Sequence, residues 1–99
     1  MSNIESEQEF YNRADKFIYL ANEQCKVAIS GKVSSSLLYA AARFSAYDMA
    51  SKSATLSEMK KDKEEAIEFF CGRFREMLVE NLDDYIANYE QYISQSRDA

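Results

Sequence analysis

Apolar side chains recur at spacings of three and four positions along most of this chain, which is the pattern of one helix face. Near the start they are Phe10, Ala14, Phe17, Ile18, Ala21, Cys25 and Ala28. Glu5, Glu7 and Glu9 come first, where acidic groups favour the positive end of a helix dipole. Because "SGK" at 30–32 supplies a glycine stop, we predict a first helix over residues 5–29.

A second helix is predicted over residues 34–52. It begins in the serine run 34–36, where a hydroxyl can accept a hydrogen bond from a free backbone N–H. Three alanines, Ala42, Ala46 and Ala50, then share one face. Small side chains let a neighbouring backbone approach closely, so we expect this helix to be the closely packed member of a bundle.

A third helix is predicted over residues 56–95, because no strong breaker follows Thr55. "TLSE" places Glu58 three residues after Thr55, which is the spacing of a capping box. The apolar stripe of this helix comprises Ile67, Phe70, Phe74, Met77, Leu78, Leu82, Tyr85, Tyr89 and Tyr92. At 1.5 Å per residue the helix would extend about 60 Å, whereas the first helix would extend only about 37 Å.

These unequal lengths leave two arrangements open. The third helix bends near "ENLDD" (80–84), where Asn81 or Asp83 recaps it, and the chain is a monomer with a fourth helix. Alternatively its second half projects and packs on another chain. Exposed aromatic patches mark interaction surfaces, and this one would comprise Tyr85, Ile86, Tyr89, Tyr92 and Ile93. We favour the second arrangement, a homodimer.

The composition agrees with an all-α protein. The chain has 99 residues, no proline and two glycines, and 46% of its residues are hydrophobic. Helix breakers are therefore scarce, and the length suits a single domain over residues 1–99 with a modest core. We predict an antiparallel three-helix bundle whose third helix is long and is either continuous or kinked or broken.

Charge and the start of the chain limit the partners and the location. A net charge of −5 repels phosphate backbones, so no nucleic-acid partner is expected. The opening "MSNIESEQEF" does not resemble a secretory signal, and no window approaches the roughly 18 apolar residues of a membrane span. We predict a cytoplasmic protein with no membrane partner. Cys25 and Cys71 would then stay reduced, as small buried apolar residues.

The chain lacks the residues that most catalytic mechanisms require. The chain has no histidine, so it lacks the Glu-x-x-His motifs of di-iron bundles. A cysteine nucleophile needs a neighbouring base or a positive environment, whereas Cys25 and Cys71 both lie on apolar stripes. No glycine-rich loop cradles phosphate either. We therefore predict no enzyme activity, no metal site and no cofactor.

One polar arrangement has two interpretations. Its members share a face of the first or of the second predicted helix, and they are Asp15, Tyr19, Asn22, Tyr39, Arg43 and Tyr47. In one interpretation Asp15 and Arg43 line a groove between these helices that presents the guanidinium, stacked between two phenol rings, to an anion. In the other, which we favour, they form a partly buried ion pair that fixes the register of the helices.

Three segments carry a resemblance to a known family. They are "EFYNRADKFIYLANEQ" (9–24), "VSSSLLYAAARFSAY" (33–47) and "ENLDDYIANYE" (80–90). In these segments the chain resembles a small family of uncharacterised, mainly proteobacterial proteins that share a domain of unknown function. The resemblance implies a compact helical domain of bacterial cytoplasmic origin, and it implies no reaction.

These observations predict a small interaction or regulatory module that associates with itself, and they leave open an unidentified protein as a further partner. One alternative is a domain that binds a small molecule or an anion, with or without catalysis, in the polar groove. Another is an acidic protein that binds a basic partner through its tyrosine stripe, since residues 80–99 carry five acidic side chains against one arginine.

Overall fold

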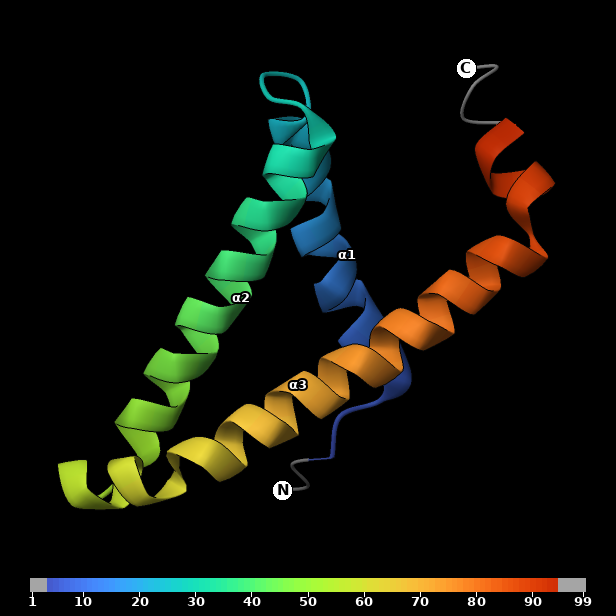
Figure 1. Ribbon diagram of the computed structural model, residues 1–99. Coiled ribbons are helices and arrows are strands. Elements are labelled where there is room, and N and C mark those ends of the chain that lie inside the picture. Colours follow the sequence, from blue (N-terminus) through green and yellow to red (C-terminus); the bar gives the residue numbers. More distant parts are fainter. Residues whose placement is uncertain (1–3, 95–99) are drawn as a thin grey trace. The chain divides into compact units, whose positions relative to one another are not determined.

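The computed structural model describes residues 4–94, and all regular structure in that range is helical. Helices α1 (Glu7–Gln24), α2 (Ser30–Lys52) and α3 (Leu56–Ala87) follow one another, and a short π-helix, η1 (Glu90–Ser94), comes last (Figure 1). The predictions of an all-α protein and of a long third helix are confirmed.

The chain divides into two compact units, Met1–Lys52 and Ser53–Ala99. The first contains α1 and α2, and the second contains α3 and η1. A single domain over residues 1–99, and a bundle of three antiparallel helices, stay predictions.

Helix α1 begins at Glu7, two residues after the predicted start, and ends earlier than expected. The Oγ of Ser6 accepts a hydrogen bond from the backbone N–H of Glu9 at 3.1 Å, which caps the helix. At the other end the N–H of Cys25 is shared between the carbonyls of Ala21 and Asn22, and the turn tightens. The predicted end at residue 29 is wrong, because the chain leaves the helix after Gln24.

Helix α2 begins at Ser30, before the serine run that was expected to start it. The carbonyl of Ile29 accepts hydrogen bonds from the N–H groups of Lys32 and Val33, at 3.0 and 3.2 Å. Gly31 therefore lies in the first turn of α2, and its φ is not positive. The predicted glycine stop is wrong because that stop requires a left-handed conformation which Gly31 does not adopt.

Helices α1 and α2 run in opposite directions and contact each other as a hairpin (Figure 1). Val33, near the start of α2, is buried, and Ala14 and Ala21 of α1 are partly buried. The alanine face of α2, composed of Ala42, Ala46 and Ala50, is exposed. Helix α1 therefore does not pack against these three small side chains.

Helix α3 begins at the predicted cap and runs without interruption for 32 residues. The Oγ1 of Thr55 accepts a hydrogen bond from the N–H of Glu58 at 3.1 Å, which confirms the cap. The bend at 80–84, which was the less favoured of the two arrangements left open, does not occur. The amide of Asn81 donates to the carbonyl of Met77 at 2.7 Å and does not recap the chain.

Helix α3 ends at Ala87 and is capped by Asn88, beyond the bend considered at 80–84. The predicted end at residue 95 lies outside the described residues. Asn88 leaves the helical conformation (φ −120°, ψ 28°), while its N–H still donates to the carbonyl of Asp84. Helix η1 follows directly. None of the helices between residues 4 and 94 has the length and apolar character needed to cross a membrane.

Candidate functional site

One face of α3 carries a continuous apolar stripe. We call it the α3 stripe, and it comprises Ile67, Phe70, Phe74, Met77, Leu78, Leu82 and Tyr85. Their exposed fractions range from 39% at Met77 to 53% at Leu82. About half of each side chain is therefore open to solvent, which is a costly state for large apolar groups.

The predicted aromatic interface continues this stripe into η1. Tyr85, Tyr89 and Tyr92 are half exposed or nearly so, Ile86 is 73% exposed, and Ile93 is partly buried. The rings of Tyr85 and Tyr92 contact each other with centroids 4.8 Å apart. The structure thus brings two of the five predicted residues together across the end of α3.

Asp84 accepts two side-chain hydrogen bonds at the junction between α3 and η1. Its Oδ1 accepts a hydrogen bond from the amide of Asn88 at 2.9 Å, and its Oδ2 accepts one from the hydroxyl of Tyr92 at 3.1 Å. The bond to Asp84 raises the pKa of Tyr92, because it stabilises the neutral phenol beside a negative charge. The sequence pattern did not predict this role of Asp84, because its contact with Tyr92, eight residues away, depends on the end of the helix at Asn88.

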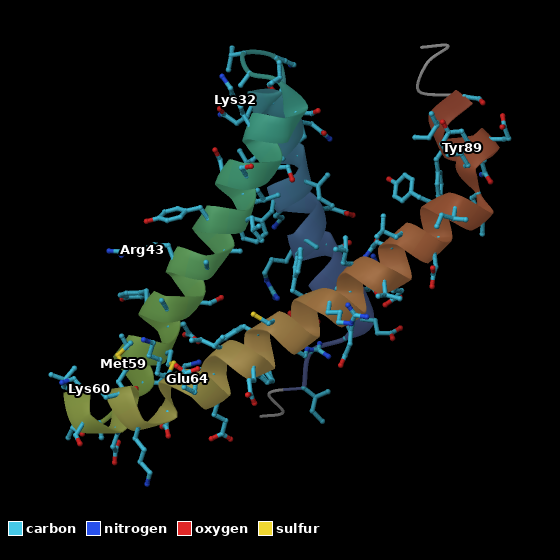
Figure 2. All side chains as sticks on the ribbon, in the orientation of Figure 1. Lys32, Arg43, Met59, Lys60, Glu64 and Tyr89 are labelled. Atoms are coloured by element: carbon cyan, nitrogen blue, oxygen red, sulfur yellow. The ribbon has the colours of Figure 1, made fainter. Side chains whose placement is uncertain are left out.

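Charge is distributed unevenly along α3 and η1. Residues 76–94 contain five acidic side chains, Glu76, Glu80, Asp83, Asp84 and Glu90, and no lysine or arginine. Lysines 60, 61 and 63 lie near the start of α3, and Figure 2 labels Lys60 there. The two ends of this unit therefore differ in charge.

The predicted polar groove is not assembled in the hairpin. Asp15, Tyr19 and Asn22 are exposed on α1, and Tyr39, Arg43 and Tyr47 are exposed on α2. Among residues 4–94, neither Asp15 nor Arg43 takes part in an ion pair, and no ring stacks on the guanidinium. Figure 2 shows Arg43 projecting away from α1. The partly buried ion pair that we favoured is therefore absent.

The ion pairs among residues 4–94 lie within single units, on exposed surface. Lys26 pairs with Glu23 and Lys52 pairs with Asp48, at 3.1 and 3.0 Å. Arg13 pairs with Glu5, and this contact lowers the pKa of the Glu5 carboxyl while it raises the pKa of Arg13. Such exposed pairs are typical of solvated helix surfaces.

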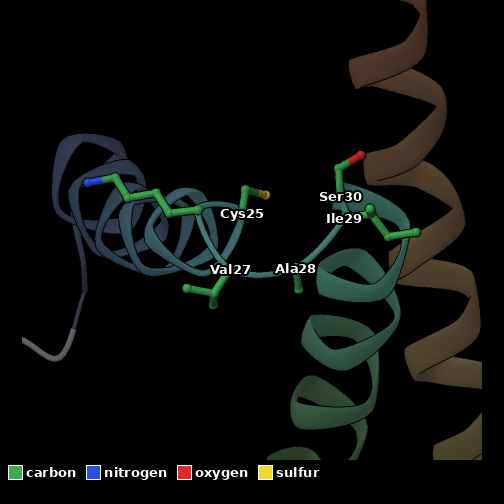
Figure 3. A pocket seen from close by; sticks show the side chains of 6 residues that line it. Cys25, Val27, Ala28, Ile29 and Ser30 are labelled. Atoms are coloured by element: carbon green, nitrogen blue, oxygen red, sulfur yellow. The ribbon is translucent and has the colours of Figure 1, made fainter.

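The turn between α1 and α2 surrounds an open hollow, which Figure 3 shows from close by. It is lined by Cys25, Lys26, Val27, Ala28, Ile29 and Ser30. Cys25 is exposed here, as Cys71 is on α3, so the prediction of buried cysteines is wrong. No group of three metal-binding side chains gathers here or elsewhere among residues 4–94.

Comparisons with known proteins agree with the helical fold and assign no reaction. Residues 10–86 match a family described as "Protein of unknown function (DUF3144)". The chain is also similar to a Shewanella protein whose structure was determined by NMR, with 35% sequence identity and a TM-score of 0.74. That similarity covers 95% of this chain and 98% of the Shewanella chain. No curated protein matches the chain.

Proposed function

Since this chain belongs to the DUF3144 family of proteins of unknown function, we propose a role from its own geometry: it is a small interaction module that associates with itself through α3. The observation that carries this proposal is the α3 stripe, whose seven large apolar side chains are each about half exposed. Burying such side chains contributes about 25 cal/mol per Å² of apolar surface removed from water. A face of this kind favours association.

Helix lengths support a partner from outside the chain. Helix α3 has 32 residues and extends about 48 Å, whereas α1 and α2 have 18 and 23 residues and extend about 27 and 35 Å. Even a hairpin packed along α3 would leave at least about 13 Å of it uncovered, and η1 adds to that length. The aromatic continuation at Tyr85, Tyr89 and Tyr92 then needs other cover.

A second chain of the same kind is the simplest occupant, because homo-oligomers with two-fold symmetry are the commonest assemblies. The proposal is consistent with the family match, which indicates neither an enzyme activity nor its absence. The acidic stretch 76–94 supports a second possibility, a basic protein partner at the same surface.

The test compares two phenylalanines that lie five positions apart, about 140° around the helix. Phe74 belongs to the α3 stripe, whereas Phe69 lies off it, and their exposed fractions are 47% and 58%. The oligomeric mass of the wild type, Phe74→Asp and Phe69→Asp is measured by light scattering after size-exclusion chromatography. Circular dichroism checks that each variant is helical.

We expect the wild type to have twice the 11.4 kDa mass of one chain. Phe74→Asp should weaken the dimer by about a hundredfold or more, because it places a charge in an apolar interface. Phe69→Asp should leave the mass unchanged. A wild type that stays at one chain mass at high concentration would contradict self-association and would leave the basic partner as the occupant to test.

A further inference from the structure

We infer that the second copy lies antiparallel on α3, with Lys60 of each chain opposite Asp84 of the other; this arrangement rests on the self-association proposed above. It defines which residues meet across the interface, and it makes the interface isologous, so that the assembly closes as a dimer.

The inference starts from a seam of side chains along α3. Two sets of residues, each spaced by seven, are offset by three positions, which is the pattern of the a and d positions in a coiled coil. The first set is Lys60, Ile67, Phe74 and Asn81, and the second set is Lys63, Phe70, Met77 and Asp84. The seam is thus apolar in its middle and polar at both ends, with cationic residues at one end and an anionic residue at the other.

Charge decides the direction of pairing. In a parallel pair Lys60 would face Lys60 and Asp84 would face Asp84, and such like charges repel. In an antiparallel pair with Lys60 opposite Asp84, the same register places Ile67 opposite Met77 and Phe70 opposite Phe74. The apolar middle is then buried, and both ends carry opposite charges.

Asp84 and Lys60 are each suited to form this ion pair between chains. The carboxylate of Asp84 is oriented by hydrogen bonds from Asn88 and Tyr92. No carboxylate among residues 4–94 lies within ion-pair distance of Lys60, so its ammonium group is available to a second chain. An oriented acceptor also loses less side-chain entropy when the pair forms.

Disulfide cross-linking tests the direction. Cys25 and Cys71 are both exposed and are first replaced by serine in the full chain. Ile67→Cys and Met77→Cys are then prepared separately, and each is oxidised alone and as a mixture. In the antiparallel register residues 67 and 77 face each other, whereas residue 67 lies about 15 Å along the axis from its own copy. We expect the mixed disulfide to form at least tenfold faster than either homotypic one.

A charge reversal gives an independent readout. Lys60→Glu should weaken the dimer about tenfold, because it puts like charges at both ends. The control Lys61→Glu makes the same change of charge one position off the seam and should have a smaller effect. The double variant Lys60→Glu/Asp84→Lys should recover part of the lost affinity, because opposite charges face each other again while the hydrogen bonds from Asn88 and Tyr92 to residue 84 are lost.

The outcomes separate the two proposals. A wild type that is a monomer by light scattering overturns self-association itself. A dimer that cross-links homotypically, or through neither position, leaves self-association standing and overturns the antiparallel register. A dimer with fast mixed cross-linking, together with recovery in the double charge variant, supports the register.

Discussion

The hairpin of α1 and α2 and the single helix α3 use similar apolar side chains in different settings. In the hairpin two helices contact each other, and Val33 is buried to 8% exposure. Among the described residues of the second unit, no side chain of α3 or η1 is buried. Caps and side-chain spacing can form α3, but a helix cannot bury its own apolar stripe, which becomes buried only when another element packs on it.

The largest expected loss of stability that distinguishes the hairpin from α3 is at Val33. Val33→Ala removes two buried methyl-sized groups and should lower the free energy of unfolding by about 2 kcal/mol. Urea denaturation followed by circular dichroism measures the change, and amide hydrogen exchange locates it. We expect faster exchange in α1 and α2 than in α3.

Val27→Ala is the matched control, because Val27 is 82% exposed in the turn between the two helices. It should change the stability by less than about 0.5 kcal/mol. If Val33→Ala accelerated exchange equally in all three helices, the hairpin and α3 would unfold as one cooperative unit, and the contrast between them would fail.

A smaller effect is expected at the start of α3. Thr55→Ala removes the side chain that accepts the hydrogen bond from Glu58, and should destabilise α3 by about 1 kcal/mol. Gly72→Ala should act in the opposite direction by about 0.5 to 1 kcal/mol, because a Cβ at Gly72 meets nothing within 4 Å.

Thermal unfolding of the two single variants and of the double variant checks both values. The two sites are seventeen positions apart in one helix, so their effects should add. A Gly72→Ala variant less stable than the wild type would show that another chain approaches α3 on that side.

The smallest expected effect on stability concerns the hydrogen bond between Tyr92 and Asp84, at the junction between α3 and η1. The pKa of Tyr92 is raised by its hydrogen bond to Asp84, so this contact stabilises the fold below the ordinary tyrosine value of 10.0. That contribution is lost as the pH rises through the higher pKa of the folded state. Titration of the tyrosine ring carbons by NMR should show Tyr92 ionising above the ordinary value.

Asp84→Asn removes the negative charge and should bring the pKa of Tyr92 back towards 10.0. Tyr92→Phe should lower the melting temperature slightly at neutral pH, and the difference from the wild type should shrink at alkaline pH. An unchanged titration in Asp84→Asn would contradict the assigned cause of the shift.

Much of the helical structure follows from local patterns in the sequence. The periodicity of Phe70, Phe74 and Leu78 predicts α3, and Thr55 with Glu58 predicts where it begins. The predictions failed where one residue type serves two conformations. The glycine stop predicted at Gly31 is wrong, and so is the less favoured alternative in which Asn81 or Asp83 recaps the chain, because Gly31 and Asn81 each lie inside a helix.

The predicted sites depended on contacts that spacing alone does not determine. Asp15 and Arg43 each lie where helix periodicity places them, yet their helices do not bring them together. The aromatic interface over residues 85–93 stays a prediction, and the positions of Tyr85 and Ile86 at the end of α3 follow from the same periodicity. The hydrogen bonds of Asp84 could not be predicted, because they require the change to η1.

The sequence by itself determined the helical class, the apolar stripe of α3 and its cap, because these depend on interactions between residues a few positions apart. Only the tertiary structure decided that Val33 is buried, that Arg43 is unpaired in the hairpin, and that Tyr92 bonds to Asp84. Such contacts depend on where the chain leaves one helix and enters the next, which a few backbone dihedrals at residues 25–29 and at Asn88 control.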